Sequence, residues 1–141
     1  MSYDIANCSG NDTEYICNRL VEYNLSQVAK TQESDFVYIN KKIVDEENNI
    51  VAGCVAKMYC WNVVYVDILW VDEKHRKHGF GTRLLKEIEK IALEEKCSLI
   101  HLDTFDFQAK DFYIKQGYEV FGILEDCPVN HCRYYLKKKL K

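Results

Sequence analysis

The chain has 141 residues, of which 48% are hydrophobic and 13% aromatic, and it carries a formal net charge of -3. This length suits a single domain, residues 1–141, with a substantial hydrophobic core. The acidic balance argues against a general nucleic-acid binder, and no apolar run is long enough to cross a membrane. No basic segment followed by an apolar one opens the chain, so we expect no signal peptide.

Seven cysteines make an odd count, and several of them stand inside apolar runs. That pattern is typical of reduced thiols in a cytoplasmic protein, where cysteine serves as a small hydrophobic residue. Cys127 and Cys132, with His131 between them, lack the spacing and the fourth ligand of a zinc site. We therefore expect no metal.

The first half of the chain predicts a helix and several strands joined by short turns. A short strand is expected at Tyr3–Asn7, and Asn11 or Asp12 is a good N-cap for a helix that runs to about Tyr23. Asparagine and acidic residues at 45–49 indicate a hairpin turn. The strands expected on either side of it are Phe36–Val44 and Ile50–Tyr59.

The second half alternates strands and helices. The segment Val63–Val71 is so rich in Val, Ile, Tyr and Trp that it predicts a strand covered on both faces. An apolar stripe at helical spacing predicts a long helix over Thr82–Lys96. The remaining expected elements are a strand at Ser98–Thr104, a helix at Ala109–Gln116 and strands at Glu119–Leu124 and Cys132–Leu136. The order predicts an α/β fold with a mixed sheet and helices on both of its faces.

The most informative motif is Arg76-Lys77-His78-Gly79-Phe80-Gly81, which lies between an expected strand and an expected helix. Glycines let backbone N–H groups approach an anion closely, and a helix points its positive end at the same place. The three cationic side chains add donors. A Gly-x-Gly pair is also found in ordinary strand-to-helix turns, so the motif indicates phosphate binding only together with its flanking elements.

This loop, with the Thr-Arg-Leu-Leu that follows it, resembles the acetyl-CoA loop of the GNAT N-acetyltransferases. A second block, from Ala109 through Tyr113 to Gly117-Tyr118, is similar to the family's Ala-x-x-(Leu/Phe)-Tyr-x-x-x-Gly-Phe segment. The resemblance is strong from about Ile50 to Leu124. It implies a mostly antiparallel sheet in which one pair of parallel strands splays apart, and an enzyme that transfers an acetyl group from acetyl-CoA to a primary amine.

The resemblance also implies the residues that hold the coenzyme. Backbone groups of the first splayed strand meet the pantetheine arm and polarise the acetyl oxygen, and the glycine loop holds the pyrophosphate. The expected coenzyme-binding residues are Leu69, Trp70, Val71, Arg76, Lys77, His78, Gly79, Phe80, Gly81 and Thr82. The family's asparagine, three residues before Ala109, is Asp106 in this chain, and Gln108 is the candidate to replace its amide.

By the same resemblance, Tyr113 is the general acid that protonates the leaving thiolate. The base is open. Asp67, in the middle of an apolar strand, either deprotonates the amine or serves as a structural hydrogen-bonding group, and His131 is a second candidate. Glu125 and His131 are candidates for contact with the acceptor.

The acceptor amine is either a small molecule or a protein amine. The sequence also allows a homodimer. The alternative to an enzyme is a catalytically silent module that binds coenzyme A or acyl-CoA as a sensor or assembly factor. The position of Tyr113 in its matched block argues against a silent module.

Overall fold

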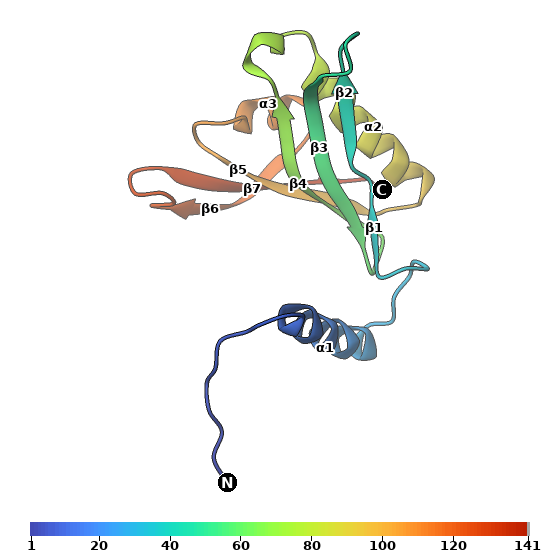
Figure 1. Cartoon of the computed structure of the whole chain (residues 1–141). Coiled ribbons are helices and arrows are strands. Elements are labelled where there is room, and N and C mark those ends of the chain that lie inside the picture. The colour runs from blue at the N-terminus through green and yellow to red at the C-terminus, as the bar shows by residue number, and fades with distance from the viewer. Residues whose placement is uncertain (141) are drawn as a thin grey trace. The chain divides into compact units, whose positions relative to one another are not determined.

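The computed structural model describes residues 1–140, which form two units, Met1–Lys30 and the remainder from Thr31 onward. The expected single domain therefore stays a prediction. The elements are α1 (Asp12–Gln27), β1 (Phe36–Tyr38), β2 (Lys41–Val44), β3 (Ile50–Tyr59), β4 (Val63–Val71), a single 3-10 turn (Glu73–His75), α2 (Phe80–Glu94), β5 (Leu99–Phe105), α3 (Lys110–Lys115), β6 (Glu119–Glu125) and β7 (Cys132–Lys139) (Figure 1).

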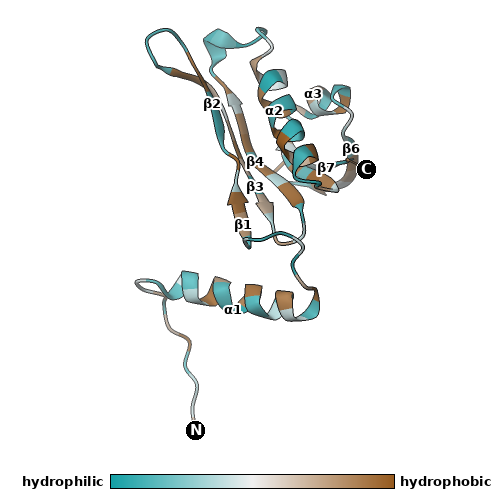
Figure 2. Cartoon of the chain, turned by 90° about the vertical axis from the view of Figure 1, so that its right-hand side faces the viewer, coloured by the Kyte–Doolittle hydropathy of each residue, from teal (hydrophilic) through white to brown (hydrophobic). Residues whose placement is uncertain are grey.

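The first unit contains one helix. α1 has Asn11 at its N-cap position, as predicted, and continues one turn beyond the predicted end at Tyr23. None of its residues is buried, and hydrophobic and hydrophilic residues alternate along it (Figure 2). The predicted strand at Tyr3–Asn7 is wrong, because these residues form no strand and are bonded to no neighbouring strand in the part of the chain that the structure describes. A strand needs such a neighbour to satisfy its backbone groups.

The second unit is built on a seven-stranded sheet of order β1-β3-β4-β5-β7-β6, with β2 also paired to β3. The pair β4–β5 is parallel and every other pair is antiparallel. This confirms the mixed, mostly antiparallel sheet. α2 and α3 both pack against the same face of it (Figure 2). A helix on the second face, for which α1 is the candidate, stays a prediction.

The expected strand Phe36–Val44 is two strands, β1 and β2, separated at Ile39 and Asn40. Both interrupting residues bond to the same residue of β3: the Ile39 N–H donates to the Ala56 carbonyl, and the Asn40 side-chain oxygen accepts from the Ala56 N–H at 3.0 Å. The Asn40 side chain replaces a backbone acceptor and redirects the chain. The predicted turn at 45–49 is confirmed, with the Asp45 carboxylate accepting two backbone N–H groups.

The core lies between the sheet and the two helices. α2 contributes Leu84, Leu85, Ile88 and Ala92, which are all buried, as the helical spacing predicts. It begins at Phe80 rather than Thr82, directly after Gly79, whose φ of 77° is left-handed. Within the second unit β4 is covered on one face, where Val64 and Val66 are its fully buried residues and α2 and α3 pack. Cover of its other face stays a prediction.

Candidate active site

The parallel strands β4 and β5 separate part of the way along their length. Their pairing runs from Val63 opposite Leu99 to Val66 opposite Leu102 and then stops. β4 continues to Val71, bonded only to β3, and β5 continues to Phe105, bonded only to β7 (Figure 1). The inner edges of this gap therefore carry backbone groups with no partner strand, which are available to a ligand except where Arg76 bonds the Val71 carbonyl and Gln108 bonds the Phe105 N–H. The predicted splayed strand pair is confirmed.

A β-bulge in β4 lies where the separation begins. Val55 of β3 pairs with Ile68 and Ala56 pairs with Val66, so Asp67 is an extra residue in β4. One inserted residue reverses which side chains face the core. Val64 and Val66 face it before the bulge, and Leu69 and Val71 pack against it after the bulge. Asp67 itself is exposed, which removes the cost of placing a carboxylate in this apolar strand.

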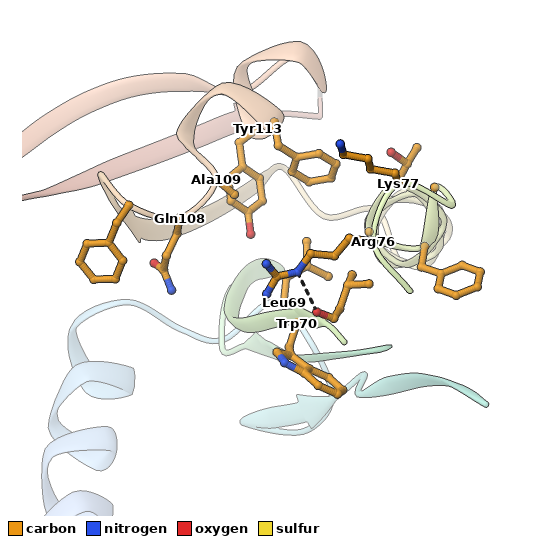
Figure 3. A pocket seen from close by; sticks show the side chains of 14 residues that line it. Leu69, Trp70, Arg76, Lys77, Gln108, Ala109 and Tyr113 are labelled. Atoms are coloured by element: carbon orange, nitrogen blue, oxygen red, sulfur yellow. Dashed lines mark hydrogen bonds between the residues drawn. The ribbon is translucent and has the colours of Figure 1, made fainter. Parts of the chain in front are cut away.

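A cavity of about 550 Å³ opens at the gap (Figure 3). Its walls come from the end of β4, the glycine loop, the start of α2, the β5–α3 loop and α3. The lining residues are Leu69, Trp70, Val71, Arg76, Lys77, Gly79, Phe80, Gly81, Thr82, Phe107, Gln108, Ala109, Phe112 and Tyr113. All predicted coenzyme-binding residues except His78 line this cavity, together with the predicted acid, Tyr113.

The glycine loop is shaped for close approach from one side. Lys77 and Gly79 both have left-handed φ angles, of 68° and 77°, and a Cβ built on Gly79 would have nothing within 4 Å. The Arg76 side chain donates through Nε to the Val71 carbonyl at 3.3 Å, which ties the loop to the end of β4 (Figure 3). The free N–H groups of the first turn of α2 follow immediately. Exposed cations and unpaired amides together suit an anion such as a pyrophosphate.

Tyr113 is buried, with 6% of its surface exposed, and its hydroxyl points into the cavity (Figure 3). Its ring lies edge-on to Phe112 at 5.2 Å and to Tyr118 at 5.9 Å. Burial raises the pKa of Tyr113 well above its usual value, and the nearby Cys54 and Asp103 add to the rise. A phenol with a raised pKa stays protonated at neutral pH, so this hydroxyl can donate a proton or a hydrogen bond.

Tyr118, whose ring packs against Tyr113, belongs to a buried cluster of polar side chains that also includes Glu89 and Lys138. The Tyr118 hydroxyl donates to the Glu89 carboxylate of α2 at 2.9 Å, and Lys138 of β7 donates to the same oxygen at 3.2 Å. Burial raises the pKa of Tyr118, and the Glu89 charge raises it further. Sequence reasoning missed this group. The only available sign was an acidic residue, Glu89, directly beside the apolar stripe of α2.

The departure from the family pattern at Asp106 has a structural explanation. The Asp106 carboxylate accepts hydrogen bonds from His131 Nδ1 at 2.9 Å and from the Cys132 N–H at 3.0 Å, so it faces the β6–β7 loop. Burial alone would raise the pKa of Asp106, but these hydrogen bonds outweigh it and lower the pKa. Gln108 lines the cavity instead. Its Oε1 accepts from the Phe105 N–H at 2.7 Å, which leaves its NH₂ group as a donor.

The candidate bases and acceptor contacts do not line the cavity. Asp67 lies in the bulge, and Glu125 is exposed at the end of β6. His131 is exposed and packs edge-on against Phe107, which does line the cavity, at 5.4 Å. The structure thus brings the predicted acid together with the glycine loop, and it leaves Asp67, His78, Glu125 and His131 outside.

Within residues 1–140 no group of three His, Cys, Asp or Glu side chains is arranged to hold a metal ion. None of the helices in this range is long and apolar enough to span a membrane. All seven cysteines are free thiols, and Cys54, Cys60 and Cys97 are buried.

Comparison with known proteins gives concordant matches. Residues 6–118 match the model of the acetyltransferase (GNAT) family. Blasticidin-S acetyltransferase from Streptomyces morookaense is 35% identical over 96 residues, which cover 67% of this chain and 70% of that protein. A crystal structure of an acetyltransferase from Bacillus cereus superposes with a TM-score of 0.87 at 38% identity, covering 97% of both chains.

A more distant structure, an acetyltransferase from Bacillus anthracis in complex with acetyl coenzyme A, has a TM-score of 0.64 at 24% identity. It covers 77% of this chain and 64% of the other, and at this identity it shows a shared fold. The family model spans most of the chain, including the glycine loop and the helix α3 that enclose the cavity. The chain therefore belongs to the GNAT family of acetyltransferases.

Proposed function

We propose that this protein is an acetyl-CoA-dependent N-acetyltransferase that acts on a primary amine by direct attack of the amine on the thioester. The observation that carries the proposal is the cavity itself. It joins an anion-binding loop at one end to a buried, protonated tyrosine hydroxyl at the other, between two strands that no longer pair with each other there.

The walls of the cavity fit the coenzyme in parts. Amides of Lys77 to Thr82 and the Arg76 side chain surround the proposed pyrophosphate position. Backbone groups of β4 near Leu69, which have no partner strand on that side, run along the proposed pantetheine position, and an N–H there polarises the acetyl oxygen. The Gln108 NH₂ group supplies a further donor on the opposite wall, in place of the family's asparagine.

In the proposed reaction a C–N bond forms as the thioester C–S bond breaks, without an enzyme-bound acetyl group. Tyr113 gives its proton to the departing sulfur and regains one from solvent. The amine loses its proton to water or to a carboxylate. Asp67 acts through a bridging water in this proposal, because it is exposed beside the gap but does not line the cavity. His131, oriented by Asp106, remains the second candidate base.

The test is thiol release from acetyl-CoA across a panel of amines, with the products identified by mass spectrometry. Release that depends on an amine and yields an N-acetyl product supports the enzyme. Tight binding of acetyl-CoA without release, for any amine class, would support the silent coenzyme-A-binding module instead. The free thiols are consistent with a reducing compartment, and we propose the cytoplasm.

A further inference from the structure

A polar network lies on the sheet face opposite α2, at the place where β4 and β5 separate. Side chains alternate between the two faces of a strand. In β5 the residues Ile100, Leu102 and Thr104 are buried, so Asp103 faces the other way. By the same alternation Tyr65 of β4 and Arg133 of β7 face the same side as Asp103. The network therefore runs from β7 across β5 to β4, beside the point where β4 and β5 separate.

Asp103 is at the centre of the network, and both of its carboxylate oxygens accept hydrogen bonds within it. Arg133 donates to Asp103 Oδ1 from Nε at 2.9 Å and from Nη2 at 2.6 Å. The Tyr65 hydroxyl donates to Asp103 Oδ2 at 2.9 Å. Burial and this hydrogen bond raise the pKa of Tyr65 to about 12, so it remains a donor. Since its side chain is only 15% exposed, Asp103 is poorly placed to receive an ammonium group.

Arg133 is the group of the network that is presented to a ligand, with 33% of its side chain exposed. Its guanidinium lies over the Phe105 ring at 5.3 Å and over the Tyr135 ring at 5.7 Å. The two rings and Asp103 fix its plane and orientation. A guanidinium carries five N–H donors, and Asp103 engages Nε and Nη2, so the Nη1 edge is left for another partner.

The network is close enough to Tyr113 for the Asp103 charge to raise the pKa of that tyrosine. The glycine loop, α2 and α3 occupy the other face, so the proposed coenzyme lies on their side of the gap. If the coenzyme fills that side, the face that carries Arg133 is left for the approach of the amine. The network does not line the cavity, but Asp103 connects the Arg133 guanidinium to the neighbourhood of Tyr113.

We infer that the acceptor is a primary amine that also carries a carboxylate, and that Arg133 binds this carboxylate. The inference rests on the proposed function and narrows its substrate class. A carboxylate matches the free edge of the guanidinium in shape and charge. Polyamines and aminoglycosides offer only cations, which the Arg133 guanidinium repels.

The kinetic test uses pairs of acceptors that differ only in a carboxylate, such as lysine with cadaverine and phenylalanine with phenethylamine. We expect the carboxylated member of a pair to have a kcat/KM higher on the order of tenfold or more, the scale of a charge-assisted hydrogen bond. Arg133→Gln should remove this preference through KM for the amine. Phosphoethanolamine with ethanolamine is a further pair, and a preference confined to it would show that the site is for phosphate and overturn the carboxylate inference.

Lys137→Gln is the matched control, because Lys137 is a cation on the same strand and the same face as Arg133. It should keep the preference. Arg133→Gln leaves Asp103 without its cation, so the double variant Arg133→Gln/Asp103→Asn replaces the ion pair with neutral amides and guards against unfolding. A folded double variant that keeps the carboxylate preference would overturn the inference.

A binding measurement separates this inference from the proposed function. Calorimetry on the protein with coenzyme A compares N-acetyl amino acids with the corresponding N-acetyl amines that lack the carboxylate. Stronger binding of the carboxylated compounds, lost in Arg133→Gln, supports the Arg133 site even if no turnover is found. Turnover of amines with no preference for a carboxylate in either experiment would leave the enzyme intact and refute the site.

Discussion

The Tyr118 hydroxyl donates a 2.9 Å hydrogen bond to the Glu89 carboxylate, and both residues are buried. Glu89 also receives Lys138 at 3.2 Å and Lys86 at 3.6 Å. A buried carboxylate that loses one of its donors keeps the desolvation cost without the compensating bond. The Tyr118 ring in turn packs against Tyr113, so this pair connects the stability of α2 to the position of the proposed acid.

We predict that Tyr118→Phe lowers the free energy of unfolding by about 1–3 kcal/mol, the cost of leaving a buried polar group with an unmade hydrogen bond. Urea denaturation of the two proteins measures this. The control is Tyr38→Phe, at an exposed tyrosine in β1, which should change stability little. Equal stability of Tyr118→Phe and the native protein would show that the bond to Glu89 contributes nothing.

Tyr113→Phe should lower kcat on the order of 100-fold, the usual scale for removing a general acid, while the affinity for acetyl-CoA changes little. The deficit should shrink with a thioester whose thiol is a better leaving group. Steady-state kinetics with an accepted amine, under conditions where chemistry limits the rate, measures both effects. Native turnover by the variant would leave Tyr113 with a packing role only.

Gly79→Ala should weaken coenzyme binding and cost about 1–2 kcal/mol of stability, because a φ of 77° is strained for any residue with a Cβ. Space is not the reason, since nothing lies within 4 Å of the added atom. Gly81→Ala is the comparison. Its Cβ would meet the Phe112 ring at 3.5 Å, an ordinary contact, and its φ is not left-handed, so a smaller loss of stability is expected. Calorimetry with acetyl-CoA compares the affinities of the two variants, and thermal unfolding compares their stabilities.

Acetyl-CoA should stabilise the native protein. A ligand that binds only the folded state adds about 2.7 kcal/mol at a hundredfold excess over its dissociation constant. Thermal unfolding with and without acetyl-CoA, with dephospho-coenzyme A and a non-nucleotide thioester as controls, measures the shift. The absence of any shift at millimolar ligand would contradict the assignment of the cavity to the coenzyme.

The stability of the protein should fall as the pH drops below about 6.5, the usual pKa of histidine, in part through His101. Burial lowers the pKa of His101 in the folded state, although the Asp103 charge opposes this. The unfolded chain therefore takes up this proton at a higher pH than the folded one. The loss of stability should level off below the pKa of His101 in the folded state. The Nε2 atom of His101 lies 2.7 Å from the Tyr59 hydroxyl, and only a neutral imidazole can accept a hydrogen bond from that hydroxyl.

The variant His101→Gln should show a shallower loss of stability between neutral and acidic pH than the native protein. Denaturant unfolding at a series of pH values gives the comparison, and His78→Gln, in the exposed loop, is the control. Identical pH profiles for native protein and His101→Gln would show that this histidine does not titrate differently on folding.

The elements that the sequence predicts well are those whose partners lie nearby in the chain or whose apolar pattern is long. The hairpin β3–β4 and the stripe of α2 are of this kind, and so are the two motifs that form the cavity. The strand predicted at Tyr3–Asn7 failed because composition alone cannot supply a neighbouring strand. The break at Asn40 depends on one side-chain hydrogen bond to a residue of another strand.

The contacts that define the acceptor side were harder to foresee, because they join residues far apart in sequence. Tyr65, Asp103 and Arg133 come from three strands, and no local spacing relates them. An alternation of polar and apolar residues in β5 was visible in the sequence, but its partner on β7 depends on the order of the strands. Asp67 was recognised as unusual, and only the register of β3 and β4 shows that it is an inserted residue.

The inserted Asp67 divides β4 into two segments with different structural roles. Val64 and Val66 belong to the segment whose substitution threatens folding, whereas Leu69 and Val71 belong to the segment that shapes the cavity. Mutational tolerance should therefore change abruptly within a single strand. Selection for a new acyl donor can act on the second segment while the first continues to hold the sheet together, so one strand provides both a fixed scaffold and an adaptable wall.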